Sequence, residues 1–177
     1  MSSTSHELRV NSIVAESIVD GPGLRYVVFT QGCPHRCHAC HNPQTHDVGG
    51  GYLLDVETII HQFDENPLLA GITFSGGEPF LQPDPLCVIA KQVRRRAKTV
   101  VVFSGFTIEA LNALADRRPA IRALLSLTDI LIDGPYIDSL RDLSLPFRGS
   151  RNQRVLTRET GFLPPTRAHT PDEGIAA

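Results

Sequence analysis

The sequence predicts an α/β fold with mainly parallel strands, arranged as a partial, open β/α barrel, and three observations carry this prediction. Short apolar runs typical of strands alternate with amphipathic segments typical of helices. The strand-like runs are apolar throughout, which favours a parallel sheet that helices cover. The chain has 177 residues, whereas a complete barrel of eight β/α units needs about 250. We therefore expect an open barrel.

Four segments predict the buried strands of this sheet. They are residues 26–30, 71–74, 99–103 and 130–133. Right-handed crossovers between parallel strands bring the carboxyl ends of the strands to one edge of the sheet. The loops that follow these four segments are therefore expected to meet on one rim.

Helices are predicted between the strands from apolar side chains at helical spacing. Asp55 and Thr107 are expected to cap the first and third helices, and Asp84 the second, with Pro85 at its first position. A shorter apolar segment at 121–125 predicts a fourth helix. The inner faces of the first three helices are Val56, Ile59, Ile60 and Phe63, then Leu86, Ala90, Val93 and Ala97, then Ile108, Leu111 and Ala115.

Length and composition indicate a single domain over residues 1–156. After it, residues 157–177 are polar and interrupted by prolines, so we expect a flexible tail there. A net charge of −2 gives no general attraction to nucleic acid or to an acidic membrane surface. No apolar run is long enough to span a membrane, and the polar start lacks the core of a signal peptide. These features predict a cytoplasmic protein with neither a nucleic-acid nor a membrane partner.

Three of the four cysteines, Cys33, Cys37 and Cys40, lie in one short loop after the first predicted strand. In a reducing compartment, clustered cysteines indicate metal ligands rather than disulfides. An iron–sulfur cubane normally takes four cysteine ligands, so three would leave one iron open for chemistry. The fourth, Cys87, stands alone in an apolar run and is expected to be a buried core thiol.

Zinc is the alternative metal for this loop. Three cysteines with one histidine form a common structural zinc set, and four histidines lie in or near the loop: His35, His38, His41 and His46. Two features weigh against zinc. The chain has no second cysteine pair, and the loop follows a strand of a parallel sheet, which is where catalytic loops lie.

A second motif, Ser75-Gly76-Gly77-Glu78-Pro79, follows the next strand. Two glycines allow bare backbone to approach a ligand closely. The motif lacks the lysine and hydroxyl residue of a phosphate-binding loop, and backbone carbonyls with a carboxylate suit an ammonium group better. A simple turn between strand and helix is the alternative interpretation.

Together the two motifs resemble those of the radical S-adenosylmethionine enzymes. Residues 20–25 (DGPGLR) are similar to the lead-in of glycyl-radical activating enzymes. Residues 103–107, 131–135 and 142–154 are similar to segments of the branch that activates anaerobic ribonucleoside-triphosphate reductase. The resemblance covers roughly residues 11–156.

The resemblance implies cofactors and roles for particular residues. The cofactors are one four-iron four-sulfur cluster, held by Cys33, Cys37 and Cys40, and S-adenosylmethionine on the open iron. Beyond the cluster, it assigns no catalytic side chain. The remaining cofactor contacts that it implies are Gly76, Gly77 and Glu78 at the methionine end, Ala39, Cys40 and His41 near the adenine, and Asp133 at the ribose or a nearby cation.

One of these positions departs from the family pattern. Many members carry an aromatic residue before the third cysteine, where this chain has Ala39, so His41 is the candidate to replace it at the adenine. The roles of Arg25 and Arg148 stay open. Arg25 would brace the loop or meet the ligand carboxylate, and Arg148 would be a surface residue or dock a partner.

The implied activity is reductive cleavage of S-adenosylmethionine to a 5′-deoxyadenosyl radical, which takes a hydrogen atom from a glycine of anaerobic ribonucleoside-triphosphate reductase. A flavodoxin-like protein is the implied electron donor. Three alternatives stay open: an activase of another glycyl-radical enzyme, a minimal radical enzyme acting on a small molecule, and a zinc-binding interaction module.

Overall fold

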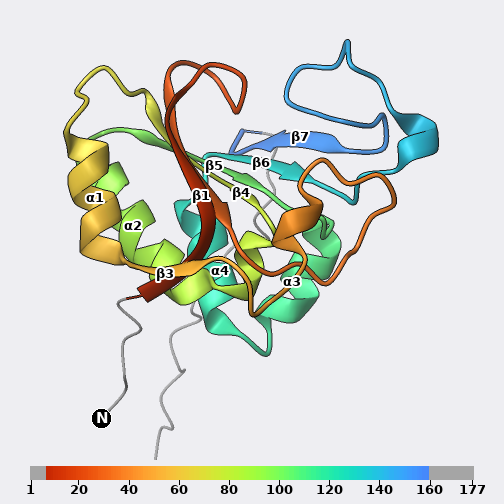
Figure 1. Ribbon diagram of the computed structural model, residues 1–177, viewed down its shortest axis with the longest axis horizontal. Coiled ribbons are helices and arrows are strands. Elements are labelled where there is room, and N and C mark those ends of the chain that lie inside the picture. The colour runs from red at the N-terminus through yellow and green to blue at the C-terminus, as the bar shows by residue number, and fades with distance from the viewer. Residues whose placement is uncertain (1–6, 160–177) are drawn as a thin grey trace, which may run out of the picture.

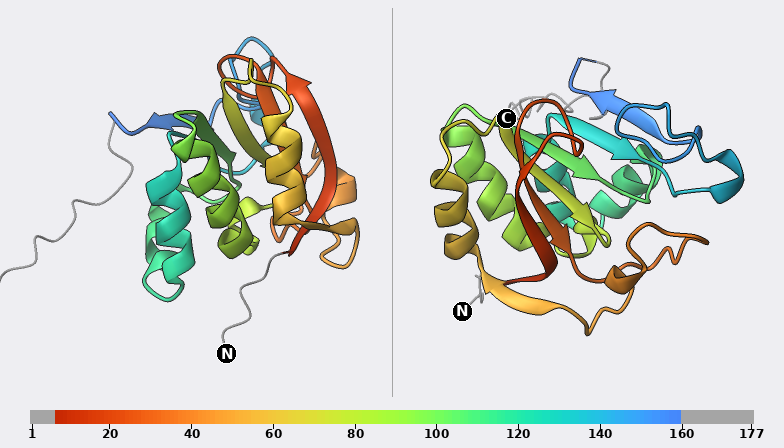
Figure 2. Two further views of the ribbon diagram at one scale, coloured as in Figure 1. Left: turned by 90° about the vertical axis from the view of Figure 1, so that its left-hand side faces the viewer. Right: turned by 45° about the horizontal axis from the view of Figure 1, so that its top comes forward.

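A computed structural model describes residues 7–159 and shows a seven-stranded mixed sheet with its helices gathered on one face (Figures 1 and 2). The strand order is β3-β1-β2-β4-β5-β6-β7, and the sheet is not closed into a barrel. Strands β2, β4, β5 and β6 are parallel to one another. The pairings β1–β2, β1–β3 and β6–β7 are antiparallel.

The bounds of the elements follow the predicted order. The strands are β1 Glu7–Ser17, β2 Arg25–Thr30, β3 Tyr52–Asp55, β4 Gly71–Gly76, β5 Thr99–Phe103, β6 Ile130–Asp133 and β7 Arg154–Thr157. The α-helices are α1 Val56–Asp64, α2 Pro83–Arg95, α3 Ile108–Ala115 and α4 Pro119–Leu127. All four predicted strands and all four predicted helices are therefore confirmed.

The predicted start and end of α2 are wrong. Gln82 is the N-cap and Pro83 occupies the first turn, so Asp84 lies inside the helix and makes no side-chain cap. Proline is favoured at this position because the missing N–H has no partner within the helix. Ala97 lies beyond the helix, is exposed and has a φ of 56°, so it does not belong to the inner face.

The sheet is parallel only in its middle, which corrects the expectation of a mainly parallel sheet. Strands β1, β3 and β7 were not predicted, and each adds an antiparallel pairing at the flanks. Strand β3 is largely exposed and β7 has no fully buried residue, so neither shows the apolar run of a buried strand. The apolar pattern identifies strands that helices cover, and these edge strands lack it.

The core lies between the helices and the sheet. Its side chains include Val28 of β2, Phe74 of β4, Ile89 of α2 and Leu131 of β6, all fully buried. Cys87 is buried, and burial raises the pKa of its thiol to about 11, as expected for a core thiol.

Arg25 connects neighbouring strands at the amino ends of the parallel strands. It is fully buried at the start of β2, where its guanidinium donates to Thr73 Oγ1 at 3.1 Å and to Thr99 Oγ1 at 2.6 Å. Burial lowers its pKa to about 10. Two roles were left open for Arg25: bracing the cysteine loop and meeting the ligand carboxylate. Because the cysteine loop leaves the opposite end of β2, the structure supports neither role.

The last described strand, β7, ends one residue beyond the predicted domain boundary at Leu156. Of the predicted tail, residues 157–177, the structure describes 157–159, and Thr157 belongs to β7, whereas residues 160–177 lie outside the described residues. Within residues 7–159, no helix is both long and apolar enough to cross a membrane.

Candidate cofactor site

The loops that follow the parallel strands meet on one side of the sheet, where the segments 31–51 and 134–153 lie near each other (Figures 1 and 2). They enclose an open cavity of about 380 Å³, within the range of small-molecule sites. The predicted site residues that line it are Cys33, Cys37, Cys40, His41, Gly76 and Gly77. The structure thus brings two motifs, separated by more than thirty residues of sequence, to one place.

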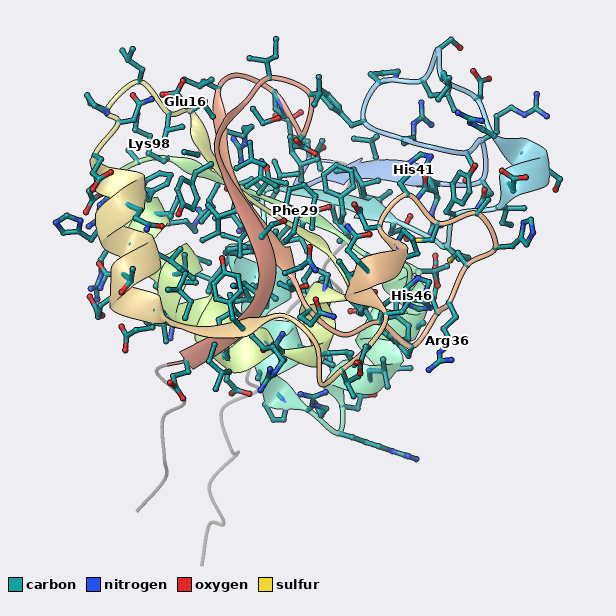
Figure 3. The ribbon with its side chains drawn as sticks, viewed as in Figure 1. Glu16, Phe29, Arg36, His41, His46 and Lys98 are labelled. Atoms are coloured by element: carbon teal, nitrogen blue, oxygen red, sulfur yellow. The ribbon has the colours of Figure 1, made fainter. Side chains whose placement is uncertain are left out.

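Backbone hydrogen bonds shape the cysteine loop. Gly32 N donates to Thr45 O at 2.8 Å, and Cys33 N donates to His46 O at 3.3 Å, which closes the loop at its base. Arg36 and Ala39 adopt left-handed φ values of 45° and 54°. Arg36 extends away from the body of the molecule (Figure 3).

The three loop cysteines are free, partly buried thiols that face a common cavity. Burial raises the pKa of the Cys33 thiol. Among the described residues, no three His, Cys, Asp or Glu side chains are gathered closely enough to hold a single metal ion. The donor set of three thiols nevertheless fits an iron–sulfur cluster, whose irons are held by cysteine thiolates.

The glycines of the second motif allow β4 to end directly against the cysteine loop. Gly77 N donates to Thr30 O and Glu78 N to Gly32 O, both at 2.8 Å. A Cβ on Gly77 would lie 2.3 Å from Gly32 O, so only glycine fits here. The backbone at Gly76 and Gly77 therefore lies bare in the cavity wall.

Glu78 lies behind that wall. Its carboxylate is fully buried and accepts hydrogen bonds from Ser104 Oγ and Gly105 N, both at 2.9 Å. His35 Nε2 lies 2.9 Å from the same carboxylate. Glu78 does not line the cavity, and its contacts join the two motifs and the β5 loop. Its contact with the ligand stays a prediction.

The resemblance implies that His41 and Ala39 lie near the adenine, but the structure places these two residues differently with respect to the cavity. The His41 ring lies 5.1 Å from that of Tyr136, between the cysteine loop and the 134–153 segment (Figure 3). Ala39 is exposed and does not line the cavity. The structure therefore places an aromatic pair at this end of the cavity, and Ala39 outside it.

Asp133 is also outside the cavity wall. It is fully buried and accepts from Ile108 N at 2.7 Å and from Arg154 Nε at 2.9 Å. Arg154 Nη2 also donates to Glu109 Oε2 at 2.8 Å, and this bond holds the pKa of Glu109 at about 2. Both oxygens of Asp133 accept hydrogen bonds from neighbouring groups, and its role at the ribose or a cation stays a prediction.

Sequence reasoning did not predict that the 134–153 segment contributes side chains to the cavity. These side chains are Tyr136, Leu143, Phe147, Arg148 and Gln153. Arg148, which was expected at the surface or at a partner, is among them. Val19 and Asp20, before β2, also line it. The signal was present because the segment follows a parallel strand, where site loops lie.

Fold and cavity together indicate a class: an α/β protein with a small-molecule cavity at the carboxyl edge of its parallel strands, lined by three free thiols that suit a thiolate-bound metal centre. Comparison with known proteins makes the class specific. The family described as a 4Fe-4S single cluster domain matches residues 19–156.

Among known relatives, the anaerobic ribonucleoside-triphosphate reductase-activating protein of Escherichia coli K12 is 36% identical over 147 residues, 78% of this chain and 91% of the relative. That of Haemophilus influenzae is 33% identical over 146 residues, 78% of this chain and 90% of the relative. The pyruvate formate-lyase-activating enzyme of Clostridium pasteurianum is 46% identical over 106 residues, 55% of this chain and 44% of the relative.

The chain therefore belongs to the 4Fe-4S single cluster domain family and, within it, to the anaerobic ribonucleoside-triphosphate reductase-activating proteins. This membership confirms the resemblance and the iron–sulfur interpretation of the cysteine loop over zinc.

Proposed function

We propose that this protein cleaves S-adenosylmethionine reductively and installs a glycyl radical on anaerobic ribonucleoside-triphosphate reductase. The observation that carries the proposal is the meeting of three thiols and bare Gly76–Gly77 backbone in one cavity. The names of relatives that match over nine-tenths of their length supply the partner. When bound, a reduced cluster supplies one electron to S-adenosylmethionine, and the cleavage yields a 5′-deoxyadenosyl radical.

The side chains and backbone of this protein would bind the cluster and orient S-adenosylmethionine. Cys33, Cys37 and Cys40 would hold the cluster. The backbone of Gly76 and Gly77 would accept hydrogen bonds from the ligand's ammonium group, while Glu78 fixes that wall from behind through its buried hydrogen bonds.

The remaining cavity walls suit the other parts of the ligand. His41 and Tyr136 offer ring faces to the adenine. Such fixed contacts are the protein's share of cofactor chemistry.

A macromolecular substrate is favoured by the mouth of the cavity. Val19 and Leu143 line the cavity yet are 72% and 73% exposed. Apolar side chains that stay exposed around a site are typical of a protein-docking surface. A glycine-bearing loop of the reductase would enter between them.

A second candidate is an activase of another glycyl-radical enzyme. The similarity to the pyruvate formate-lyase-activating enzyme favours it, although that match covers only 55% of this chain. We also propose that the open sheet is a radical S-adenosylmethionine type of partial barrel, that the protein works in the cytoplasm and that a flavodoxin-like protein donates the electron.

The test is anaerobic reconstitution with iron and sulfide, followed by measurement of 5′-deoxyadenosine after addition of reductant and S-adenosylmethionine. We expect the wild-type protein to form it and Cys37→Ala to form none. Formation by Cys37→Ala at the wild-type rate would show that the ligand assignment is wrong.

A further inference from the structure

Arg148 is the single residue with a permanent positive charge among those that line the cavity in the described part of the chain. It lies in the 134–153 segment, away from both motifs in sequence. The inference drawn from it rests on the proposed function, because it concerns how the same cavity holds S-adenosylmethionine.

The guanidinium of Arg148 is incompletely bonded. Its Nη1 donates to Gln153 O at 3.3 Å, but its Nε is buried without a hydrogen-bond partner. None of the ion pairs found between described residues includes Arg148. Arg154, six residues later, is by contrast paired with two carboxylates. An unpartnered buried donor is unfavourable, so the guanidinium keeps hydrogen-bonding capacity that its neighbours among the described residues do not use.

The turn that carries Arg148 is fixed to the loop after β6. Gly149 N donates to Gln153 Oε1 at 2.9 Å, and Gln153 Nε2 donates to Gly134 O at 3.1 Å. Gly134 and Gln153 themselves line the cavity. The backbone at Arg148 is thus positioned before any ligand arrives.

The chemistry of the ligand identifies the group that meets this charge. S-adenosylmethionine carries a sulfonium, an ammonium and one carboxylate, and the carboxylate is its single anionic group. A guanidinium matches a carboxylate in charge and in planar geometry. Asp20, the acidic residue of the lining, has the wrong charge for it. We propose that Arg148 binds the carboxylate of S-adenosylmethionine.

The test compares two ligands on the cluster-loaded protein: S-adenosylmethionine and its carboxamide analogue, which lacks the negative charge. Calorimetry under anaerobic conditions measures both affinities for wild type, Arg148→Gln and Arg148→Lys. Arg151→Gln is the matched control, since Arg151 is exposed in the same segment and does not line the cavity. Iron content and circular dichroism verify that each variant is loaded and folded.

We expect Arg148→Gln to bind S-adenosylmethionine about 10- to 100-fold more weakly than wild type, the usual range for one hydrogen bond to a charged group. Its affinity for the carboxamide should equal that of wild type. Arg148→Lys should recover part of the loss, and Arg151→Gln should bind both ligands as wild type does.

Three results would overturn the assignment. Arg148→Gln could keep wild-type affinity, or it could lose affinity for both ligands equally, which would indicate a structural role. It could also bind and cleave S-adenosylmethionine normally while failing to act on the reductase, which would make Arg148 a partner contact.

Binding of the two ligands to the wild-type protein alone also tests the proposal. If the wild type binds the carboxamide as tightly as S-adenosylmethionine, the proposal is wrong, even if Arg148→Gln does not fold. Formation of 5′-deoxyadenosine by the wild type separates this failure from a failure of the proposed function.

Discussion

Glu78, the acidic residue of the glycine motif, is held in a buried hydrogen-bond network outside the cavity wall. Its buried carboxylate receives hydrogen bonds from Ser104 and Gly105 of the β5 loop and contacts His35 of the cysteine loop. The sequence places a carboxylate at the motif but carries no information on which way the side chain turns. Packing of three loops decides that, and each of them is remote from the others in sequence.

Replacing Glu78 by glutamine should destabilise the protein. The amide has one acceptor oxygen in place of two and no charge, so buried donors lose their partners, at a cost of about 1.5–3 kcal/mol. Urea unfolding measures the change. Glu65→Gln is the control, because the Glu65 side chain is 65% exposed. Equal stability of the two variants would show that the Glu78 network contributes nothing.

Thiol labelling should distinguish Cys87 from the three loop cysteines. Cys87 is buried and its pKa is raised to about 11, so at pH 8 about one thiol in a thousand is the reactive thiolate. In cluster-free protein, iodoacetamide should modify the loop cysteines and spare Cys87, as mass spectrometry would show. In urea, all four should react. Fast labelling of Cys87 in the folded protein would contradict its place in the core.

At the scale of elements, local sequence patterns predicted the strands and helices around the core. The edge strands depend on long-range contacts. Asp55 and Thr107 cap their helices as predicted, with side chains that accept from Glu57 N and Ala110 N. The edge strands β3 and β7 were missed because exposed strands lack a continuous apolar pattern. Their pairing depends on neighbours distant in sequence, which a local pattern does not contain.

Gly77→Ala tests the junction between β4 and the cysteine loop. The added Cβ would lie 2.3 Å from Gly32 O, so the two loops must separate. We expect a lower melting temperature and weaker binding of S-adenosylmethionine, measured by calorimetry. The matched control is Gly49→Ala, whose Cβ would meet Asp47 Oδ1 at 3.5 Å, an ordinary contact. Equal behaviour of the two variants would argue against close packing at this junction.

Arg154→Ala tests the attachment of β7 to β6 and α3. It leaves the fully buried Asp133 without its cation, and we expect a loss of about 2–3 kcal/mol, below the usual range for a buried pair because Arg154 is half-exposed. Arg122→Ala breaks an exposed pair with Asp116 and should cost less than about 1 kcal/mol. Urea unfolding compares the two. A cost for Arg154→Ala no larger than for Arg122→Ala would contradict the role of Asp133.

At the scale of the whole molecule, the site is assembled from loops that the sequence separates. The order of parallel strands was sufficient to predict that the cysteine loop, the glycine motif and the loops after β5 and β6 share one rim, and residues from all four line the cavity. The side chains of the 134–153 segment could not be assigned in this way. Their contribution depends on hydrogen bonds such as Gln153 to Gly134, which fold an irregular segment over the cavity.

Electron paramagnetic resonance on the partner tests the central claim most directly. The reconstituted protein, a reductant, S-adenosylmethionine and anaerobic ribonucleoside-triphosphate reductase are mixed without oxygen. We predict a glycyl radical signal on the reductase, and none when Cys37→Ala replaces the wild-type protein. The absence of that signal, under conditions in which the wild type forms 5′-deoxyadenosine, would contradict the account.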